Sequence, residues 1–148
     1  MRLKKCITSL FIGTVFSSVI AVSAYAYNHS YYSGYSYTDT AKATGTNTTV
    51  LSMREYHLSP YVYTSATNKS GSTVYMEVAA FTYKKNGTLV KSGSDSDVLS
   101  NNSGMFTSCS DYRSTSTNVY YKHTSAIYGN TNNPSASNRI ASLSKTVG

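Results

Sequence analysis

Apolar and polar residues alternate along most of the chain in short blocks, and turn-forming residues separate the blocks. Residues 61–67 are rich in residues that favour strands, and residues 68–72 form a cluster of turn residues. Residues 73–83 then alternate over a longer run. One face of that run would carry Val74, Met76, Val78 and Ala80, and the other Tyr75, Glu77, Ala79, Phe81 and Tyr83. Because both faces are largely apolar, the pattern predicts a central strand.

Asn86-Gly87 follows this run and predicts a β-hairpin. Asn and Gly both tolerate the left-handed backbone conformation, which a two-residue type I′ turn requires at both of its central positions. Such a turn fixes the register of the two strands. The expected pairs are Lys85 with Thr88, Lys84 with Leu89, and Tyr83 with Val90.

The remaining blocks are shorter. Strands are expected over residues 40–51, with Gly45 as a bulge, and over residues 105–112, 118–128 and 139–147, the last of which also fits a helical face. Residues 27–37 resemble an edge strand or an ordered arm, and residues 52–58 a short helical turn before Pro60. Loops are expected over residues 92–97 and 129–137.

This succession of elements predicts the fold class. Six to eight short strands with turn signals between them are typical of an all-β protein, here a single small antiparallel β-sandwich. The sequence contains no repeat of fixed period and no long linker. One domain is therefore expected.

The N-terminus predicts export from the cell. A basic start is followed by a mostly apolar run over residues 6–22, and Ala24 and Ala26 provide the small residues that signal peptidase requires. We expect a signal peptide over residues 1–26, cleaved after Ala26, and a secreted domain over residues 27–148. A membrane anchor is the alternative, but the run is short and is not followed by a basic stop-transfer cluster. No transmembrane segment is expected after cleavage.

Composition narrows the class of protein. Of the 122 residues after Ala26, 50 are Ser, Thr or Asn and 14 are Tyr, whereas Leu, Ile, Val and Phe together supply 17. This composition excludes a transmembrane bundle, a coiled coil, a zinc-finger array and a disulfide-stapled miniprotein. Tyr rings are therefore expected to supply much of a thin core.

The charge of the chain points to anionic partners. The net charge of +7 falls to about +4 once the signal is removed. A mild positive charge suits weak attraction to cell-wall polymers or lipid headgroups. No basic run is longer than Lys84-Lys85, so no nucleic-acid partner is expected.

Candidates for catalysis are few. Cys109 is the one cysteine left after cleavage, and its place in an alternating block predicts a buried thiol, with pairing between chains as an alternative. Cys109, His123 and Asp111 are the one nucleophilic triad that the sequence offers, and they define a Cys/His hydrolase as a minor alternative. No glycine-rich oxyanion loop flanks Cys109, so His123 is expected to be a hydrogen-bonded strand residue and the protein not to be an enzyme.

No cofactor or metal site is expected. Asp95-Ser96-Asp97 is a fragment of a calcium loop without the glycine and the distant Glu that complete one. Glu55 and His57 lack the spacing of metal ligands on one helix face, and His29 is expected to be solvated.

Tyrosine is the remaining signal for function. Tyr together with Ser, Asn and Gly is the composition of adaptable recognition surfaces. The tyrosines nearest the new N-terminus are expected to be exposed and to bind the ligand: Tyr27, Tyr31, Tyr32 and Tyr35. The sequence thus predicts a secreted, non-catalytic binding module of a Gram-positive bacterium, with a cell-wall polymer or another envelope component as its partner.

The make-up also resembles that of small secreted β-sandwich proteins of Gram-positive bacteria, the lactococcin-972-type bacteriocins among them. The shared features are the signal peptide, the Tyr, Ser and Asn composition and the absence of an intrachain disulfide. No motif aligns residue by residue, so the resemblance assigns no family. It implies an alternative function, that of a secreted bacteriocin-like antagonist.

Overall fold

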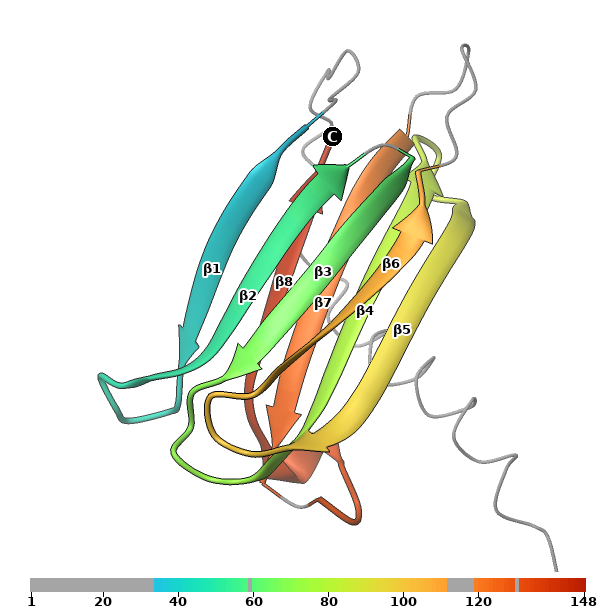
Figure 1. The fold of residues 1–148 in the computed structure, drawn as a ribbon. Coiled ribbons are helices and arrows are strands. Elements are labelled where there is room, and N and C mark those ends of the chain that lie inside the picture. Colours follow the sequence, from blue (N-terminus) through green and yellow to red (C-terminus); the bar gives the residue numbers. More distant parts are fainter. Residues whose placement is uncertain (1–33, 59, 112–118, 130) are drawn as a thin grey trace, which may run out of the picture.

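The structure, a computed structural model, describes residues 34–58, 60–111, 119–129 and 131–148. In these ranges two antiparallel sheets of four strands each pack face to face, as Figure 1 shows. Sheet A has the order β1-β2-β3-β6, with bounds Ser36–Lys42, Thr49–Leu58, Tyr61–Asn68 and Gly104–Ser110. Sheet B has the order β5-β4-β7-β8, with bounds Leu89–Leu99, Val74–Lys84, Val119–Tyr128 and Arg139–Val147. The predicted all-β sandwich is confirmed.

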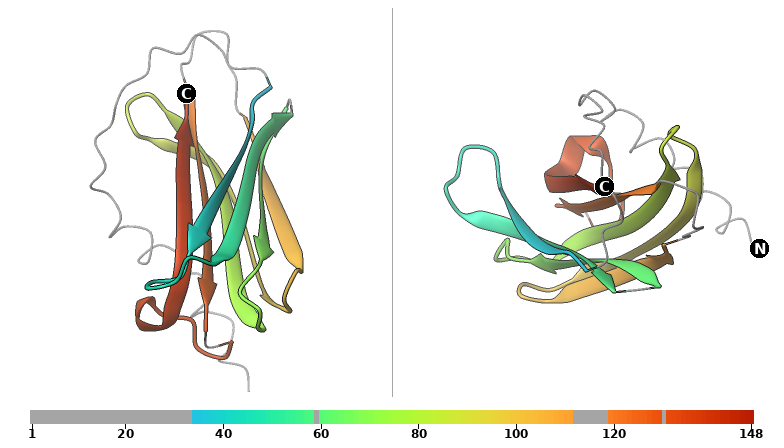
Figure 2. Two further views of the ribbon diagram at one scale, coloured as in Figure 1. Left: turned by 90° about the vertical axis from the view of Figure 1, so that its left-hand side faces the viewer. Right: turned by 90° about the horizontal axis from the view of Figure 1, so that it is seen from above.

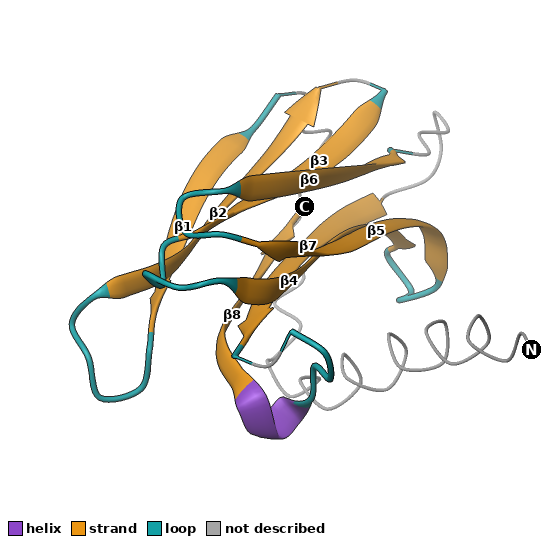
Figure 3. Cartoon of the chain, turned by 60° about the horizontal axis from the view of Figure 1, so that its bottom comes forward, coloured by secondary structure: helices purple, strands orange, loops and turns teal. Residues whose placement is uncertain are grey.

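Helix is confined to one short turn in the described ranges. This 3-10 turn, Ala136–Asn138, precedes β8 and is the purple segment of Figure 3. None of the described helical residues forms a segment with the length and apolar character needed to span a bilayer.

The core lies between the inner faces of the two sheets. At one end it is aliphatic and includes Leu51, Met76, Val78 and Ile127. At the other end it is mixed, and Tyr35, Val62, Cys109 and Tyr121 pack together there. The alternating residues of each strand account for this arrangement, since every second side chain points inward.

The two long edges of the sandwich are closed differently, as the side view and the view from above in Figure 2 help to follow. At one edge β5 packs on β6, and a Cβ atom added to Gly93 would lie only 2.0 Å from the carbonyl oxygen of Ser108. Only glycine fits such a close backbone approach. At the other edge Lys145 of β8 forms an ion pair of 3.4 Å with Asp39 of β1.

The predicted hairpin at Asn86-Gly87 exists, but its predicted register is wrong. Tyr83 pairs with Leu89 instead of Val90, and a bulge follows in the ladder. The Gly87 N–H donates to the Lys84 carbonyl over 2.9 Å, and the Lys84 N–H donates to the Thr88 carbonyl. Asn102 is the sole non-glycine residue with positive φ in the described ranges, so only Gly87, at φ 86°, is left-handed in this turn. The loop is therefore a three-residue turn with a glycine bulge, which shifts the pairing by one residue.

Two predictions near the N-terminus are also wrong. Residues 40–51 are not one strand, because Gly45 adopts a φ of 77° in the turn that separates β1 from β2. Residues 52–58 are not a helical turn but belong to β2. Its inward residues include Glu55 and His57, and these two polar residues hid the alternating pattern.

Residues 92–97 are the third correction, because they lie within β5 and not in a loop. The backbone of β5 pairs with β4 along its whole length, while most of its side chains are exposed. A strand at a sheet edge with solvated side chains tolerates Ser, Asp and Gly, although Asp and Gly are generally rare in strands.

The other predicted strands are confirmed to within a few residues. They are β3, β4, β6, β7 and β8, and β4 occupies a central position in its sheet as expected. The helical alternative for residues 139–147 is not adopted. The predicted cleavage after Ala26 lies outside the described residues.

Candidate functional site

The predicted tyrosine site divides between two regions. Tyr27, Tyr31 and Tyr32, like His29, lie outside the described residues. Tyr35 is described and is only 6% exposed, so the expectation that it is a surface residue is wrong. Its ring packs between His57, Tyr121 and His123, with centroid distances of 5.8 to 6.1 Å. Tyr35 is thus part of the core that the abundant tyrosines were expected to build.

A chain of hydrogen bonds runs through the mixed end of the core. Thr64 Oγ1 donates to the Ala79 carbonyl over 3.0 Å, so it accepts from Nδ1 of His123 over 2.9 Å. Nε2 of His123 then accepts from the Tyr35 hydroxyl over 2.8 Å. A neutral imidazole provides one donor and one acceptor, as this chain requires.

The protonation of His123 agrees with this geometry. Burial lowers the pKa of His123 to about 4, against the opposing effect of a hydrogen bond with the backbone of Tyr63. Burial also raises the pKa of Tyr35. Both groups are therefore uncharged at neutral pH, and the prediction of a hydrogen-bonded strand histidine at His123 is confirmed.

His57 and Asp111 form a second buried pair. Nε2 of His57 lies 3.1 Å from Oδ2 of Asp111, and the Gly34 N–H donates to Nδ1 of His57 over 3.2 Å. Since Nδ1 accepts, the ring proton lies on Nε2 and points at the carboxylate. The pair joins the end of β2 to the residue that follows β6.

The thiol of Cys109 is buried, as predicted, and has a partner of its own. Thr82 Oγ1 donates to the Ser110 carbonyl over 2.9 Å and lies 3.5 Å from Sγ of Cys109. The hydroxyl proton is already used, so the thiol is the donor in that contact. Burial raises the pKa of Cys109, which disfavours the thiolate that a nucleophile requires.

The residues of the predicted triad therefore belong to different hydrogen-bonded groups. His123 bonds to Tyr35 and Thr64, Asp111 bonds to His57, and Cys109 contacts Thr82. A nucleophile and its base need a direct hydrogen bond. No contact of that kind between Cys109 and His123 occurs within the described residues.

Two carboxyl groups, those of Glu55 and Asp39, lie near each other on the inner side of sheet A, close to the edge where β1 meets β8. Glu55 is fully buried, and neither of its oxygens meets a donor in the described part of the chain. The neighbouring carboxylate is that of Asp39, which forms an ion pair with Lys145. Burial and this second carboxylate raise the pKa of Glu55 to about 8, so Glu55 is protonated at neutral pH.

The fragment of a calcium loop, Asp95-Ser96-Asp97, is not buried. Asp95 and Asp97 are exposed on β5, where each accepts a hydrogen bond from the next backbone N–H along the chain. No three His, Cys, Asp or Glu side chains of the described residues gather as metal ligands.

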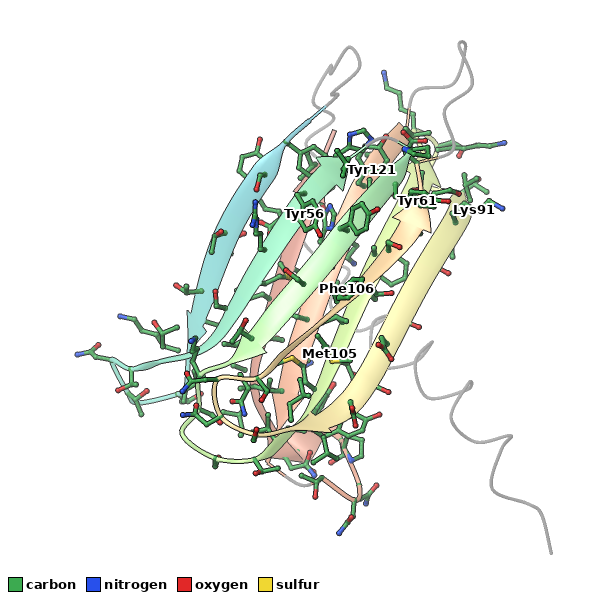
Figure 4. The ribbon with its side chains drawn as sticks, in the orientation of Figure 1. Tyr56, Tyr61, Lys91, Met105, Phe106 and Tyr121 are labelled. Atoms are coloured by element: carbon green, nitrogen blue, oxygen red, sulfur yellow. The ribbon has the colours of Figure 1, made fainter. Side chains whose placement is uncertain are left out.

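The outer surface of sheet A carries a group of large exposed or half-buried side chains, four of them aromatic, that the sequence did not single out. We call it the aromatic face, and it consists of Tyr56, Leu58, Tyr61, Tyr63 and Phe106. Phe106 is 64% exposed, Leu58 65% and Tyr61 45%. Tyr56 and Tyr63 stack at 4.8 Å, and Tyr61 meets Tyr63 edge-on at 6.2 Å. Figure 4 looks onto this face and labels Tyr56, Tyr61 and Phe106.

Strand alternation produces the aromatic face. In β3, Val62 and Thr64 point into the core, so Tyr61 and Tyr63 point outward. Across the sheet, Tyr63 pairs with Tyr56 on one side and with Ser108 on the other. The sequence Tyr61-Val62-Tyr63 was the available signal, but it becomes informative only once Val62 is known to point inward.

One positive charge borders the aromatic face. The guanidinium of Arg54 lies 5.3 Å from the centre of the Tyr56 ring, and its Nε donates to Ser36 Oγ over 3.2 Å. Neither Asp nor Glu occurs among the residues that the described strands place on the outer surface of sheet A. Asp39 and Glu55 point to the inner side.

Sheet B has aromatic residues on its outer surface too, but they are less exposed. Tyr83 stacks on Tyr120 at 5.0 Å, and Phe81 contacts Tyr83. All three are half-buried, and burial raises the pKa of both Tyr83 and Tyr120. The aromatic face of sheet A is thus the more accessible of the two.

Comparisons with known proteins add little. No protein-family model and no curated protein matches the chain. Two solved structures are similar to it: a beta-glucuronidase from glycoside hydrolase family 2, with 14% identity over 78% of the chain and a TM-score of 0.36, and the Bacteroides uniformis beta-glucuronidase, with 9% identity over 75% and a TM-score of 0.38. The chain spans 11% and 12% of their lengths. Similarity this low supports neither a family nor an activity.

Proposed function

We propose that the protein is a secreted, non-catalytic binding module that acts at the envelope of a Gram-positive bacterium through the aromatic face. The exposure of Phe106, Leu58 and Tyr61 together on one sheet carries this proposal. Single exposed apolar residues are ordinary, but several large apolar side chains exposed on one surface mark an interaction site.

The chemistry of the face suits binding rather than catalysis. Large rings with two side-chain torsions contribute contact area at a low cost in conformational entropy. Two titratable groups with strongly shifted pKa values, His123 and Glu55, are buried on the inner side of the sheets instead. The net charge of about +4 after Ala26 favours an anionic surface.

Co-sedimentation with isolated Gram-positive cell walls tests the proposal. The variant Tyr61→Ser/Phe106→Ser removes two exposed rings of the aromatic face. We expect it to bind at least about tenfold more weakly, the equivalent of ~1.4 kcal/mol. Leu89→Ser is the matched control, because Leu89 is an exposed apolar residue of sheet B.

Two results would contradict the proposal. The first is that the wild-type protein stays in solution when the walls are sedimented. The second is that the double variant binds as tightly as the control. Killing of indicator bacteria by the purified protein would instead favour the bacteriocin-like alternative.

A further inference from the structure

We infer that the aromatic face binds an acidic polysaccharide, with a sugar ring against Phe106 and a carboxylate of the same polymer held by Arg54. This inference rests on the proposed function and specifies the ligand class of that same surface. The two residues lie in one row across three strands: Arg54 pairs with Ser65, and Ser65 pairs with Phe106. Two strand spacings separate them by about 10 Å.

The surroundings of Phe106 leave its ring open to a ligand. Ser65 lies opposite and Ser108 is the next residue on the same face, and both side chains are too short to cover the ring. The C–H groups of a pyranose pack on an aromatic face while its hydroxyls stay hydrated. The short side chain of Ser65 between the two anchors leaves room for an extended polymer.

Hydroxyl groups surround the rings on this surface. The outward residues of sheet A include Ser36, Ser52, Ser65, Ser108 and Ser110, and Leu58 is the aliphatic member of the aromatic face. The core of a protein–protein interface is depleted in Ser and largely apolar. A polyhydroxylated ligand matches the donors and acceptors of this surface better than a protein partner does.

Arg54 supplies the charge complementarity. Its Nε is used by Ser36, and no carboxylate of the described residues pairs with it. The two terminal nitrogens of a guanidinium bind a carboxylate in a bidentate fork. With neither Asp nor Glu on this surface of the described strands, an incoming carboxylate meets attraction and no repulsion.

The test uses the full protein and isolated walls in three forms: untreated, with their carboxylates amidated, and with their phosphodiesters removed by hydrofluoric acid. We expect amidation to weaken binding at least tenfold and phosphodiester removal to change it less than threefold. Arg54→Gln should weaken binding to untreated walls tenfold and have no further effect on amidated walls. Lys122→Gln, which removes one charge from the outer surface of sheet B, is the matched control and should bind normally.

Polygalacturonate and its methyl ester provide a defined probe for the same comparison. Phe106→Ser should weaken binding to both, whereas Arg54→Gln should weaken binding to the acid alone. If amidated walls bind as tightly as untreated walls, or if Arg54→Gln and Lys122→Gln behave alike, the inference is overturned while wall binding, and with it the proposed function, stands. Loss of binding only after phosphodiester removal would also overturn it, because a phosphate polymer is then the ligand.

Discussion

The hydroxyl of Tyr35 donates a hydrogen bond of 2.8 Å to Nε2 of His123, across the interior of the sandwich. Tyr35 immediately precedes β1 in sheet A, and His123 is a fully buried residue of β7 in sheet B. This bond therefore helps to join the two sheets at the mixed end of the core. It also completes the chain that continues through Thr64 to the Ala79 carbonyl.

The first prediction is that Tyr35→Phe lowers the free energy of unfolding by about 1–3 kcal/mol, because it leaves the buried Nε2 of His123 without a donor. Urea denaturation measures the difference. Tyr56→Phe is the control, since it removes the hydroxyl of a half-buried tyrosine on the outer surface of sheet A. It should change the free energy of unfolding by less than about 0.5 kcal/mol. Equal effects of the two substitutions would show that the bond to His123 contributes nothing.

The second prediction concerns the raised pKa of the buried Glu55. The pKa of Glu55 is raised from 4.5 to about 8 in the folded protein, so between these values the folded state binds more protons than the unfolded state. The contribution of Glu55 to stability is therefore complete below pH 4.5, and it is lost as the pH rises to about 8. The slope is at most about 1.4 kcal/mol per pH unit.

Glu55→Gln isolates this contribution, because an amide cannot ionise. We expect the wild-type protein to lose stability relative to Glu55→Gln by a few kcal/mol between pH 4.5 and pH 8. Chemical denaturation at a series of pH values measures the difference. A constant difference across this range would mean that the fold does not raise the pKa of Glu55.

The third prediction follows from the close approach of β5 to β6. Gly93→Ala would place a Cβ atom 2.0 Å from the carbonyl oxygen of Ser108, so the backbone must move. We expect a loss of about 1–3 kcal/mol or more, as for other overpacked sites. Ser94→Ala is the control at the next, exposed position of the same strand. Thermal unfolding that is equal for both variants would contradict the close contact of the two edges.

The sequence predicts the strands that have one apolar and one polar face, because the alternation identifies them. It also predicts the central strand, because both of its faces are largely apolar. It fails where inward positions are polar. Glu55 and His57 occupy such positions in β2, and their partners, Asp39 and Asp111, come from distant parts of the chain. Only tertiary structure brings these partners together.

The candidate site was missed for a related reason. Tyrosine is suited to both a core and a surface, so composition does not distinguish Tyr35, which is buried, from Tyr61, which is exposed. The decision depends on which face of each strand meets the other sheet. The charge of Arg54 and the ring of Phe106 lie 52 positions apart in the sequence, and only the pairing through Ser65 aligns them.

The fourth prediction uses the hairpin to separate two turn geometries. A type I′ turn would need left-handed backbone at both Asn86 and Gly87, whereas the observed turn needs it at Gly87 alone. Gly87→Val should therefore lower stability by more than about 1 kcal/mol, because a β-branched residue resists that conformation. Asn86→Ala should cost less than about 1 kcal/mol, since it loses only the exposed hydrogen bond from the Thr88 N–H to the Asn86 side chain. Urea denaturation of both variants distinguishes the geometries, and equally large losses would restore the type I′ turn and with it the pairing of Lys85 with Thr88.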